Sequence, residues 1–471
     1  MSLRETDLLA VGGGTAGLVS AAGAAYLGAS PTLVEKSALG GDCLWTGCVP
    51  SKALLASARL AHQMRHAEAL GLRGTAPGPA FGEVMARMRS ARDTVAHHDD
   101  PERFRSMGVE GAFGSARFVD RDVVEVEGVG RIRSKRIILA TGAVPAPPPV
   151  PGLEEVGYLD HHSVFEIDSL PARVTILGGG PIGLEFSQIF RRLGAEVTVV
   201  EMSDRLLPKE DRDMAEVLGR ILRGEGIDIR LGSRAEKAER RGEAVVVRTD
   251  DGGEIEGDAL FVATGRRPAT DGLELDRAGV RLQENGGVEV DDRLRSSNPH
   301  VWAAGDVAGG MQFTHLAEAM AKTALRNALV PGSSTMDYDH VPWVTYTDPE
   351  LANIGLSQEE AEAEGGTTYR YGFDDLDRAI VEGATEGLVK IHADGGGRIL
   401  GASILGAHAG ELLFPLVLAR RKGLTLSDIA DTIFPYPTMS EGIKRAANEY
   451  QRGRLDGLGG TLLKKVISWT T

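Results

Sequence analysis

Cysteine is nearly missing from this chain. Only two cysteines occur among 471 residues, and they lie five positions apart, at Cys43 and Cys48. Small secreted domains that depend on disulfides are rich in cysteine, so that class is excluded. A disulfide closing so short a loop removes little conformational entropy from the unfolded chain, and stability therefore gives no reason for the pair. The spacing instead favours reversible redox chemistry.

Positive charge and aromatic residues are also scarce. Lys and Arg number 52 against 67 Asp and Glu, which gives a formal net charge of -15, and aromatics make up 5% of the chain. This balance leaves no basic patch for phosphate neutralisation, so we expect no nucleic-acid partner. The apolar fraction of 42% and the 61 glycines favour an α/β protein with many tight turns.

Long apolar runs are absent as well. No run reaches the roughly 18 residues that span a bilayer, so we expect no membrane partner. No signal-peptide pattern precedes the apolar strand predicted at residues 7–11, and we expect a cytoplasmic location. A persistent structural disulfide is unusual there, which again favours a catalytic cysteine pair.

The segment around the cysteines predicts an activated thiol. Pro50 suits a first helical turn, and the residues after it are good helix formers. Cys48 should therefore lie near a helix N-terminus, where partial positive charge favours a thiolate. Lys52 adds a cation about one turn further on. Cys43 is expected in the preceding loop, free to meet a reaction partner.

A Gly-rich turn between an apolar strand and a helix occurs twice, at residues 12–17 and 178–183. In each copy the next strand ends in an acid 23 residues after the first glycine, at Glu35 and Glu201. Each copy is also followed by a strand ending in Ala-Thr-Gly. The motif residues are Gly12, Gly14, Gly17, Thr141, Gly142, Gly178, Gly180, Gly183 and Gly265.

This repeated pattern predicts two dinucleotide sites. The glycines allow a tight turn and close approach of a pyrophosphate, the helix N-terminus supplies N–H donors, and the acid accepts from a ribose. We expect a flavin beside the cysteines and a nicotinamide at the second turn. Glu201 favours NADH over NADPH, because a carboxylate repels the extra phosphate, although the nearby Arg205 could reverse this preference.

The rest of the chain shows three further features. A Pro-rich stretch at residues 145–152 predicts a stiff linker. Asp306 ends a strand and could accept from a sugar or ribityl hydroxyl, and a helix is predicted from Thr314. From residue 341 the pattern changes to that of an α+β domain, with a helix predicted over residues 409–422. The amphipathic tail at residues 462–469 is expected to be a docked or frayed terminus.

Together these motifs resemble the pyridine nucleotide–disulfide oxidoreductases, the family containing dihydrolipoamide dehydrogenase, glutathione reductase and mercuric reductase. The resemblance covers essentially the whole chain. It implies a homodimer with two Rossmann-like dinucleotide-binding domains and a C-terminal α+β dimerisation domain. The implied boundaries are 1–150 for FAD, 151–270 for NAD(P), 271–340 for the segment completing the flavin site, and 341–471 for dimerisation.

The resemblance also implies roles for individual residues. Cys48 would face the flavin in charge transfer, and Cys43 would be the interchange thiol that meets the substrate. Lys52 and Glu185 would form an ion pair at the flavin ring. The implied adenosine-ribose ligand is Glu35 and the implied ribityl ligand is Asp306, while the helix from Thr314 would point its N-terminus at the flavin.

The chain departs from the family near its C-terminus. Disulfide reductases carry a His there, followed by a Glu that orients it, and this His serves the partner subunit's interchange thiol. Here Glu441 is kept, but Tyr436 takes the His position. Because an unperturbed Tyr titrates at about 10 and a His at about 6.5, the phenol is a poor base at neutral pH. Tyr in this position resembles mercuric reductases, but their C-terminal cysteine pair is missing here. The alternative is that Tyr436 is an interface aromatic without a chemical role.

Three functions are consistent with these residues. The first is an NAD(P)H-dependent FAD enzyme whose Cys43–Cys48 disulfide passes electrons to a small-molecule or metal-ion acceptor, namely a thiol-linked compound, a metal ion or a specialised disulfide. The second is a flavin-mediated quinone or diaphorase-type reductase in which the cysteines are auxiliary. The third is a non-catalytic dimeric subunit, which the complete nucleotide motifs disfavour.

The histidines suggest no resident metal. His161 and His162 follow the Pro-rich linker and are expected at the surface, and His97 and His98 lie in a polar run. No set of His, Cys and acidic residues has the sequence spacing of metal ligands.

Overall fold

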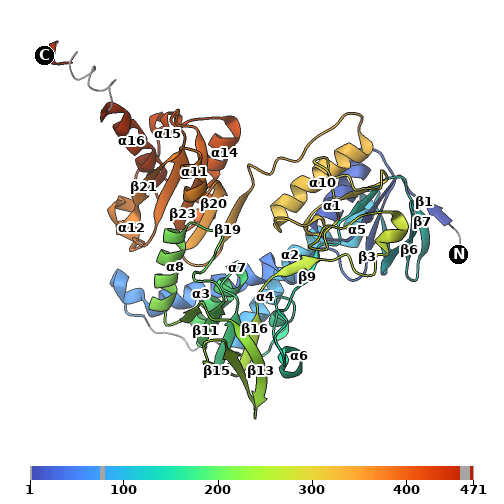
Figure 1. Cartoon of the computed structure of the whole chain (residues 1–471), viewed down its shortest axis with the longest axis horizontal. Coiled ribbons are helices and arrows are strands. Elements are labelled where there is room, and N and C mark those ends of the chain that lie inside the picture. The colour runs from blue at the N-terminus through green and yellow to red at the C-terminus, as the bar shows by residue number, and fades with distance from the viewer. Residues whose placement is uncertain (1–2, 75–79, 457–466, 470–471) are drawn as a thin grey trace.

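The computed structural model describes residues 3–74, 80–456 and 467–469. Its first sheet has five parallel strands in the order β18-β8-β2-β3-β4. The strands are β2 (Leu8–Val11), β3 (Pro31–Glu35), β4 (Glu110–Phe113), β8 (Ile137–Leu139) and β18 (Val301–Ala303). Helices α1 (Thr15–Tyr26) and α10 (Thr314–Leu329) pack side by side against this sheet (Figure 1). All of β2 is buried, as expected for a central parallel strand.

The second parallel sheet has the same topology as the first but one strand fewer. Its four parallel strands run in the order β12-β11-β10-β16. They are β10 (Arg173–Leu177), β11 (Glu196–Glu201), β12 (Asp228–Leu231) and β16 (Ala259–Val262). In both sheets the strand before the Gly-rich turn lies between the strand that ends in the acid and the strand before Ala-Thr-Gly. The predicted internal repeat is therefore confirmed.

Antiparallel strands accompany each parallel sheet. In the first half they are β1 (Leu3–Glu5), β5 (Ala116–Asp120), β6 (Val123–Val126) and β7 (Gly130–Arg133), with β1 parallel to β7. In the second they are β13 (Ala235–Arg241), β14 (Ala244–Thr249) and β15 (Glu254–Gly257). The halves are joined by the pairing of β9 (Ala143–Pro145) with β17 (Arg266–Pro268), so the Pro-rich linker begins inside a strand.

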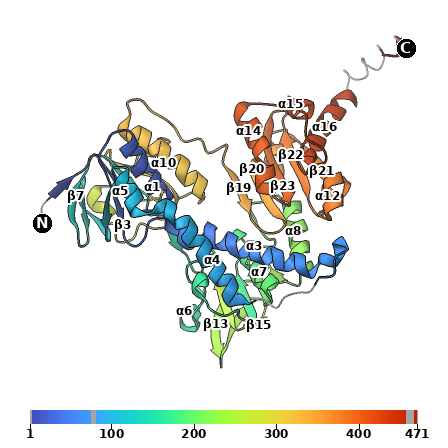
Figure 2. The ribbon, with the colours of Figure 1, turned by 180° about the vertical axis from the view of Figure 1, so that it is seen from behind.

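Two long helices, α3 (Cys48–Arg65) and α4 (Phe81–Ala96), connect the halves. Leu54 and Ala58 of α3 and Met85 of α4 share a buried cluster with Phe186 and Phe190 of α7 (Pro181–Leu193). The apolar positions on α3 recur at helical spacing, which gives it one face to bury. Figure 2 shows α3 running along α7 and beneath the C-terminal sheet.

The C-terminal unit is an antiparallel sheet with helices packed against it. Its strands are, in spatial order, β19 (Pro342–Thr345), β20 (Glu350–Gly355), β23 (Ile399–Gly406), β22 (Leu388–Ala393) and β21 (Thr367–Gly372). Its longest helix is α16 (Glu441–Asp456). The fold is thus mixed α/β, as predicted. Residues 462–466 of the expected tail lie outside the described residues.

One helix expectation in this unit is wrong. The segment 409–422 forms two helices, α13 (Ala409–Leu412) and α14 (Phe414–Lys422), in place of one. Pro415 lies in the first turn of α14, where its missing N–H costs nothing, and so it starts a new helix after Leu413. Among the described residues, no helix is both long and apolar enough to cross a bilayer.

Candidate active site

The structure places the two cysteines on consecutive helices. Cys48 is the first residue of α3, as predicted. Cys43 lies in the one-turn helix α2 (Gly41–Trp45) and not in a loop, so that expectation is wrong. Gly40 and Gly41 have φ angles of 110° and 59°, which permit the sharp entry into α2 that the sequence pattern did not reveal.

The thiols differ in acidity. The pKa of Cys48 falls to about 6, because Cys43 donates a hydrogen bond to it and because the Thr314 hydroxyl and the Lys52 cation favour the anion against the opposing effect of burial. The hydrogen bond to Cys48 and burial raise the pKa of Cys43. The Thr314 Oγ1 atom lies 3.6 Å from the Cys48 sulfur. The pair therefore titrates as a unit, with the anion on Cys48 and the proton on Cys43.

Lys52 and Glu185 meet, as the resemblance implied. The Lys52 Nζ atom lies 2.7 Å from Glu185 Oε2, and the Glu185 side chain is only 8% exposed. The backbone N–H of Tyr346 donates to the other Glu185 oxygen at 2.9 Å. Lys52 also lies 4.4 Å from the centroid of the Tyr346 ring. Tyr346 was not predicted, since no motif surrounds it and 161 residues separate it from Glu185.

The first Gly-rich turn is too crowded for side chains. Gly12 has a φ of 112°, and a Cβ atom there would lie 2.2 Å from the carbonyl oxygen of Ala140. A Cβ at Gly17 would lie 1.7 Å from the Gly12 oxygen. Glu35 turns back onto this loop, where its Oε2 accepts the Gly13 N–H at 2.6 Å. These contacts explain why Gly12 and Gly17 carry no side chain, and they hold the Glu35 carboxylate at the N-terminus of α1.

The second turn has the same construction. A Cβ at Gly178 would lie 2.6 Å from the Ala263 oxygen, and one at Gly183 would lie 1.9 Å from the Gly178 oxygen. Glu201 Oε2 accepts the Gly179 N–H, again at 2.6 Å. No heavy atom lies within 4 Å of a Cβ built at the middle glycine, Gly180, among the described residues. That opening, at the N-terminus of α7, fits the approach of a pyrophosphate.

Asp306, the predicted ribityl ligand, belongs to a charged group that the sequence did not predict. Arg266 donates to Asp306 Oδ2 at 2.9 Å and also forms an ion pair with Asp42. Burial raises the pKa of Asp306, with Arg266 opposing it. Arg266 directly follows the second Ala-Thr-Gly, and this position at a strand end is the only sequence signal for it.

One histidine expectation is also wrong. His161 is only 9% exposed, and it is not the surface residue we expected. Although no metal spacing is visible in the sequence, the side-chain ligand atoms of Asp42, His161 and His162 all lie within 4.8 Å of one another. Linear spacing could not show this set, because Asp42 comes from α2 and the histidines from the turn before β10. Burial and the Arg266 charge lower the pKa of His161 to about 4, so it is a neutral imidazole at pH 7.

Tyr436 lies on the surface of the C-terminal unit. It is 69% exposed, and its hydroxyl donates to Asp377 Oδ2 at 2.9 Å. That hydrogen bond raises the pKa of the phenol further above its ordinary value. Glu441 begins α16, five residues later. The exposed ring is accessible to a second subunit, and a site shared between subunits stays a prediction.

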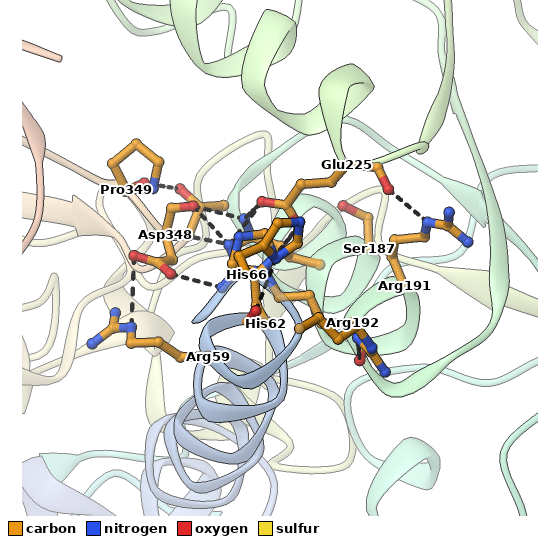
Figure 3. Close-up of polar contacts among 12 residues, drawn as sticks. Arg59, His62, His66, Ser187, Arg191, Arg192, Glu225, Asp348 and Pro349 are labelled. Atoms are coloured by element: carbon orange, nitrogen blue, oxygen red, sulfur yellow. Dashed lines mark hydrogen bonds and ion pairs between the residues drawn. The ribbon is translucent and has the colours of Figure 1, made fainter. Parts of the chain in front are cut away.

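A charge network centred on the buried Arg192, which we call the α3–α7 clamp, joins four segments of the chain. It consists of Arg59, His62, Arg192, Glu225 and Asp348 (Figure 3). Arg192, 4% exposed in its side chain, lies 2.7 Å from a carboxylate oxygen of Glu225 and 2.7 Å from one of Asp348. Two side chains of α3 contact the same carboxylates. The Arg59 Nε atom lies 3.7 Å from Asp348 Oδ1, and the His62 Nδ1 atom lies 4.0 Å from Glu225 Oε2. The clamp therefore holds α3 against α7 and fixes the register at which Lys52 meets Glu185.

Comparisons with known proteins agree with this architecture. The family model for pyridine nucleotide-disulphide oxidoreductases matches residues 6–321, and the model of their dimerisation domain matches residues 341–447. A mercuric reductase from Lysinibacillus sphaericus is 36% identical over 457 residues, which cover 95% of this chain and 83% of the relative. Dihydrolipoyl dehydrogenase 2 from Haloarcula marismortui is 37% identical over 467 residues, covering 94% of this chain and 96% of the relative.

A solved structure shares the whole fold. The Cu(II) complex of the HOCl-induced flavoprotein disulfide reductase RclA from Escherichia coli superimposes with a TM-score of 0.86 at 29% identity, covering 95% of this chain and 99% of that one. The family binds FAD and NAD(P), and its dimerisation domain supports a homodimer. The chain belongs to the pyridine nucleotide-disulphide oxidoreductases, as an NAD(P)H-dependent FAD oxidoreductase of that family.

Proposed function

We propose that this enzyme passes electrons through a Cys43–Cys48 disulfide to a metal-ion or thiol-linked acceptor. The FAD that the family binds would, when present, exchange two electrons between a nicotinamide hydride and the disulfide. Reducing a disulfide with two electrons and one proton yields one thiol and one thiolate. The acidities of this pair support that product, because Cys48 holds the anion at about pH 6 and above while Cys43 keeps the proton. This division of one anion and one proton between the two thiols is the observation that carries the proposal.

The residues around the thiols would have separate tasks. Thr314 and Lys52 stabilise the Cys48 anion, and Glu185 holds the Lys52 ammonium in place. Cys43, which is not the resting anion, would attack or ligate the acceptor after passing its proton within the pair. The glycine turns, Glu35 and Asp306 would bind the two dinucleotides.

Tyr436 supports an acceptor other than an ordinary disulfide. Cleaving an ordinary disulfide releases a thiolate that needs a proton donor of matched pKa, and losing an imidazole there costs about 10²–10⁴-fold in rate. The phenol is a poor substitute, because Asp377 raises its pKa. A metal ion held by thiols needs no such proton. The relatives include mercuric reductases, which agrees with this class of acceptor.

NADH is the proposed reductant. Glu201 is buried, and its two oxygens accept N–H bonds from Gly179 and Ser203, which aim the carboxylate at the mouth of α7. A carboxylate so placed accepts from a ribose diol and repels a phosphate. Arg205 instead donates to the carbonyl of Pro208.

The domain boundaries implied by the sequence, 1–150, 151–270, 271–340 and 341–471, remain our proposed division of the chain.

The proposal is tested by anaerobic reduction with NADH. The wild type and Cys43→Ser would be followed by flavin absorbance and by turnover with Hg²⁺, small disulfides and quinones. We expect a long-wavelength thiolate-to-flavin band in the wild type, turnover with Hg²⁺, and loss of that turnover in Cys43→Ser. Flavin reduction without the band, together with quinone turnover that survives in Cys43→Ser, would instead establish the quinone reductase.

A further inference from the structure

The three-residue group of Asp42, His161 and His162 has the chemistry of a metal site outside the cysteines. Its two imidazole nitrogens and one carboxylate oxygen suit divalent first-row ions such as Cu²⁺ and Zn²⁺. The ligand atoms all lie within 4.8 Å of one another. Donors bound to one ion at about 2.0–2.2 Å lie at most about 4 Å apart, so a small rotation of the rings completes the set.

A buried, unpartnered atom points to a missing ligand. The Nε2 atom of His161 is buried without a hydrogen-bond partner among the described residues, and His161 is 91% buried as a whole. A buried polar atom without a partner destabilises the folded state, and a bound ion would remove that penalty. The Nε2 of His162 lies 3.6 Å from Asp42 Oδ1, so the ring and the carboxylate already face each other.

The backbone holds the two rings in place. Asp160 Oδ1 accepts the N–H groups of His162 and Ser163, which closes a turn at this point of the chain. The two rings pack edge to face with their centroids 4.5 Å apart. This turn resembles the outer-sphere support found around metal ligands, because it removes the freedom of the donor residues before an ion binds.

The surrounding charges favour a cation. Two carboxylates, those of Asp42 and Asp160, act on the two imidazoles, against the single guanidinium of Arg266, whose charge is shared with Asp306. Arg266 pairs with Oδ2 of Asp42, which leaves Oδ1 directed at His162. The guanidinium weakens the attraction for a dication but also orients the carboxylate, as outer-sphere partners of metal ligands do.

We propose that Asp42, His161 and His162 form a binding site for a divalent transition-metal ion, preferentially Cu²⁺, beside the redox-active cysteines. The site has no sulfur ligand, and metal binding there does not depend on the proposed electron transfer. Asp42 directly precedes Cys43, so the site and this thiol belong to the same single-turn helix α2.

The test uses FAD-loaded enzyme in which Cys43→Ser and Cys48→Ser remove thiol binding. Titration with Cu²⁺ should show one ion per chain, with electron paramagnetic resonance splitting from two nitrogens. Adding His161→Ala or His162→Ala should weaken binding at least about tenfold, because even outer-sphere changes cost 10–100-fold. The control is the double variant His97→Ala with His98→Ala. These two histidines are also consecutive in sequence, with ring centroids 3.8 Å apart, but they are exposed and not part of the proposed site.

Binding that persists in both triad variants would overturn the proposal, as would binding that occurs only without FAD, since the flavin would then occupy these side chains. Flavin content and far-ultraviolet circular dichroism check that each variant folds. Should the His161 variant not fold, crystals of the cysteine-free enzyme soaked in Zn²⁺ decide the matter. An anomalous peak between the three side chains supports the site, and its absence overturns it.

Discussion

The Thr314 hydroxyl lies 3.6 Å from the sulfur of Cys48, although 266 residues separate them in the chain. The contact joins the N-termini of α10 and α3, which Figure 1 shows converging from different parts of the molecule. It gives a thiol at the start of one helix a hydrogen-bond donor at the start of another. Both helix ends favour negative charge at the sulfur.

Thr314→Val should raise the pKa of Cys48 from about 6 by about one unit, because the hydroxyl favours the anion and valine keeps the shape. The thiolate of the reduced wild type should thus persist down to about pH 6 and be lost as the pH falls further, while in the variant it should be lost at higher pH. Thiolate absorbance against pH measures this. Thr323→Val, on the same helix, is the control, and an unmoved midpoint in Thr314→Val would contradict the role.

Lys52 and Glu185 should shift the same titration in opposite directions. Lys52 lowers the pKa of Cys48 and Glu185 raises it, so Lys52→Met should move the midpoint up and Glu185→Gln should move it down. Lys52→Met also leaves a buried carboxylate without its cation, which should cost on the order of 1–3 kcal/mol of unfolding free energy. The double variant should recover most of that loss. Shifts of the same sign would show that the pair does not act through charge.

Tyr436→His should increase turnover with small disulfides. An imidazole at this position restores a group that titrates near neutrality, and we expect a gain of at least about tenfold, within the 10²–10⁴ range of general acid–base catalysis. Steady-state kinetics with a series of disulfides measures it. Tyr436→Phe removes only the hydroxyl and should leave disulfide turnover low. A gain in the Phe variant equal to that in the His variant would rule out acid–base chemistry as the cause.

Glu201→Gln should reduce the proposed preference for NADH over NADPH. Removing the negative charge ends the repulsion of the NADPH phosphate and weakens the bond to the ribose, which is worth about 10–100-fold for a charged acceptor. The ratio of kcat/KM for the two nucleotides measures it. Glu35→Gln is a matched control, since it alters the same bond in the first turn and should change flavin retention but not this ratio. An unchanged ratio in Glu201→Gln would remove Glu201 as the determinant.

Arg192→Met should destabilise the protein through the clamp. It leaves Glu225 and Asp348 without their buried cation, and breaking a buried pair costs about 3–5 kcal/mol. Denaturant unfolding measures the loss. Arg230→Met breaks an exposed pair with Asp228, for which about 0–1 kcal/mol is typical. Equal losses of unfolding free energy in the two variants would show that the clamp contributes no more to stability than an exposed ion pair.

The sequence predicted those parts of the site that depend on nearby residues. Both glycine turns, their acids and the helix start at Cys48 follow from spacings of fewer than 25 residues. The ion pair of Lys52 with Glu185 came only from the family resemblance. The helix α2 was missed because it is a single turn, and a pattern that short has no periodicity to detect.

The remaining parts depend on how distant segments meet. The contact of Tyr346 with Glu185, the ion pair of Arg266 with Asp42 and the proximity of His161 to Asp42 all join segments more than 100 residues apart. Whether a histidine is exposed depends on what covers it, and a polar local sequence does not reveal that cover. A paired helix start, as at Thr314 and Cys48, likewise has no linear signature.

Helix α3 has a mechanical consequence. At 18 residues it is a rod about 27 Å long, with Cys48 at one end and the clamp near the other. The clamp carboxylate of Asp348 belongs to the segment between β19 and β20, so the rod connects the thiol to the C-terminal unit. A stiff rod transmits displacement without absorbing it. A displacement of the C-terminal unit, such as one caused by binding of a second subunit, would therefore move α3 and with it the sulfur of Cys48.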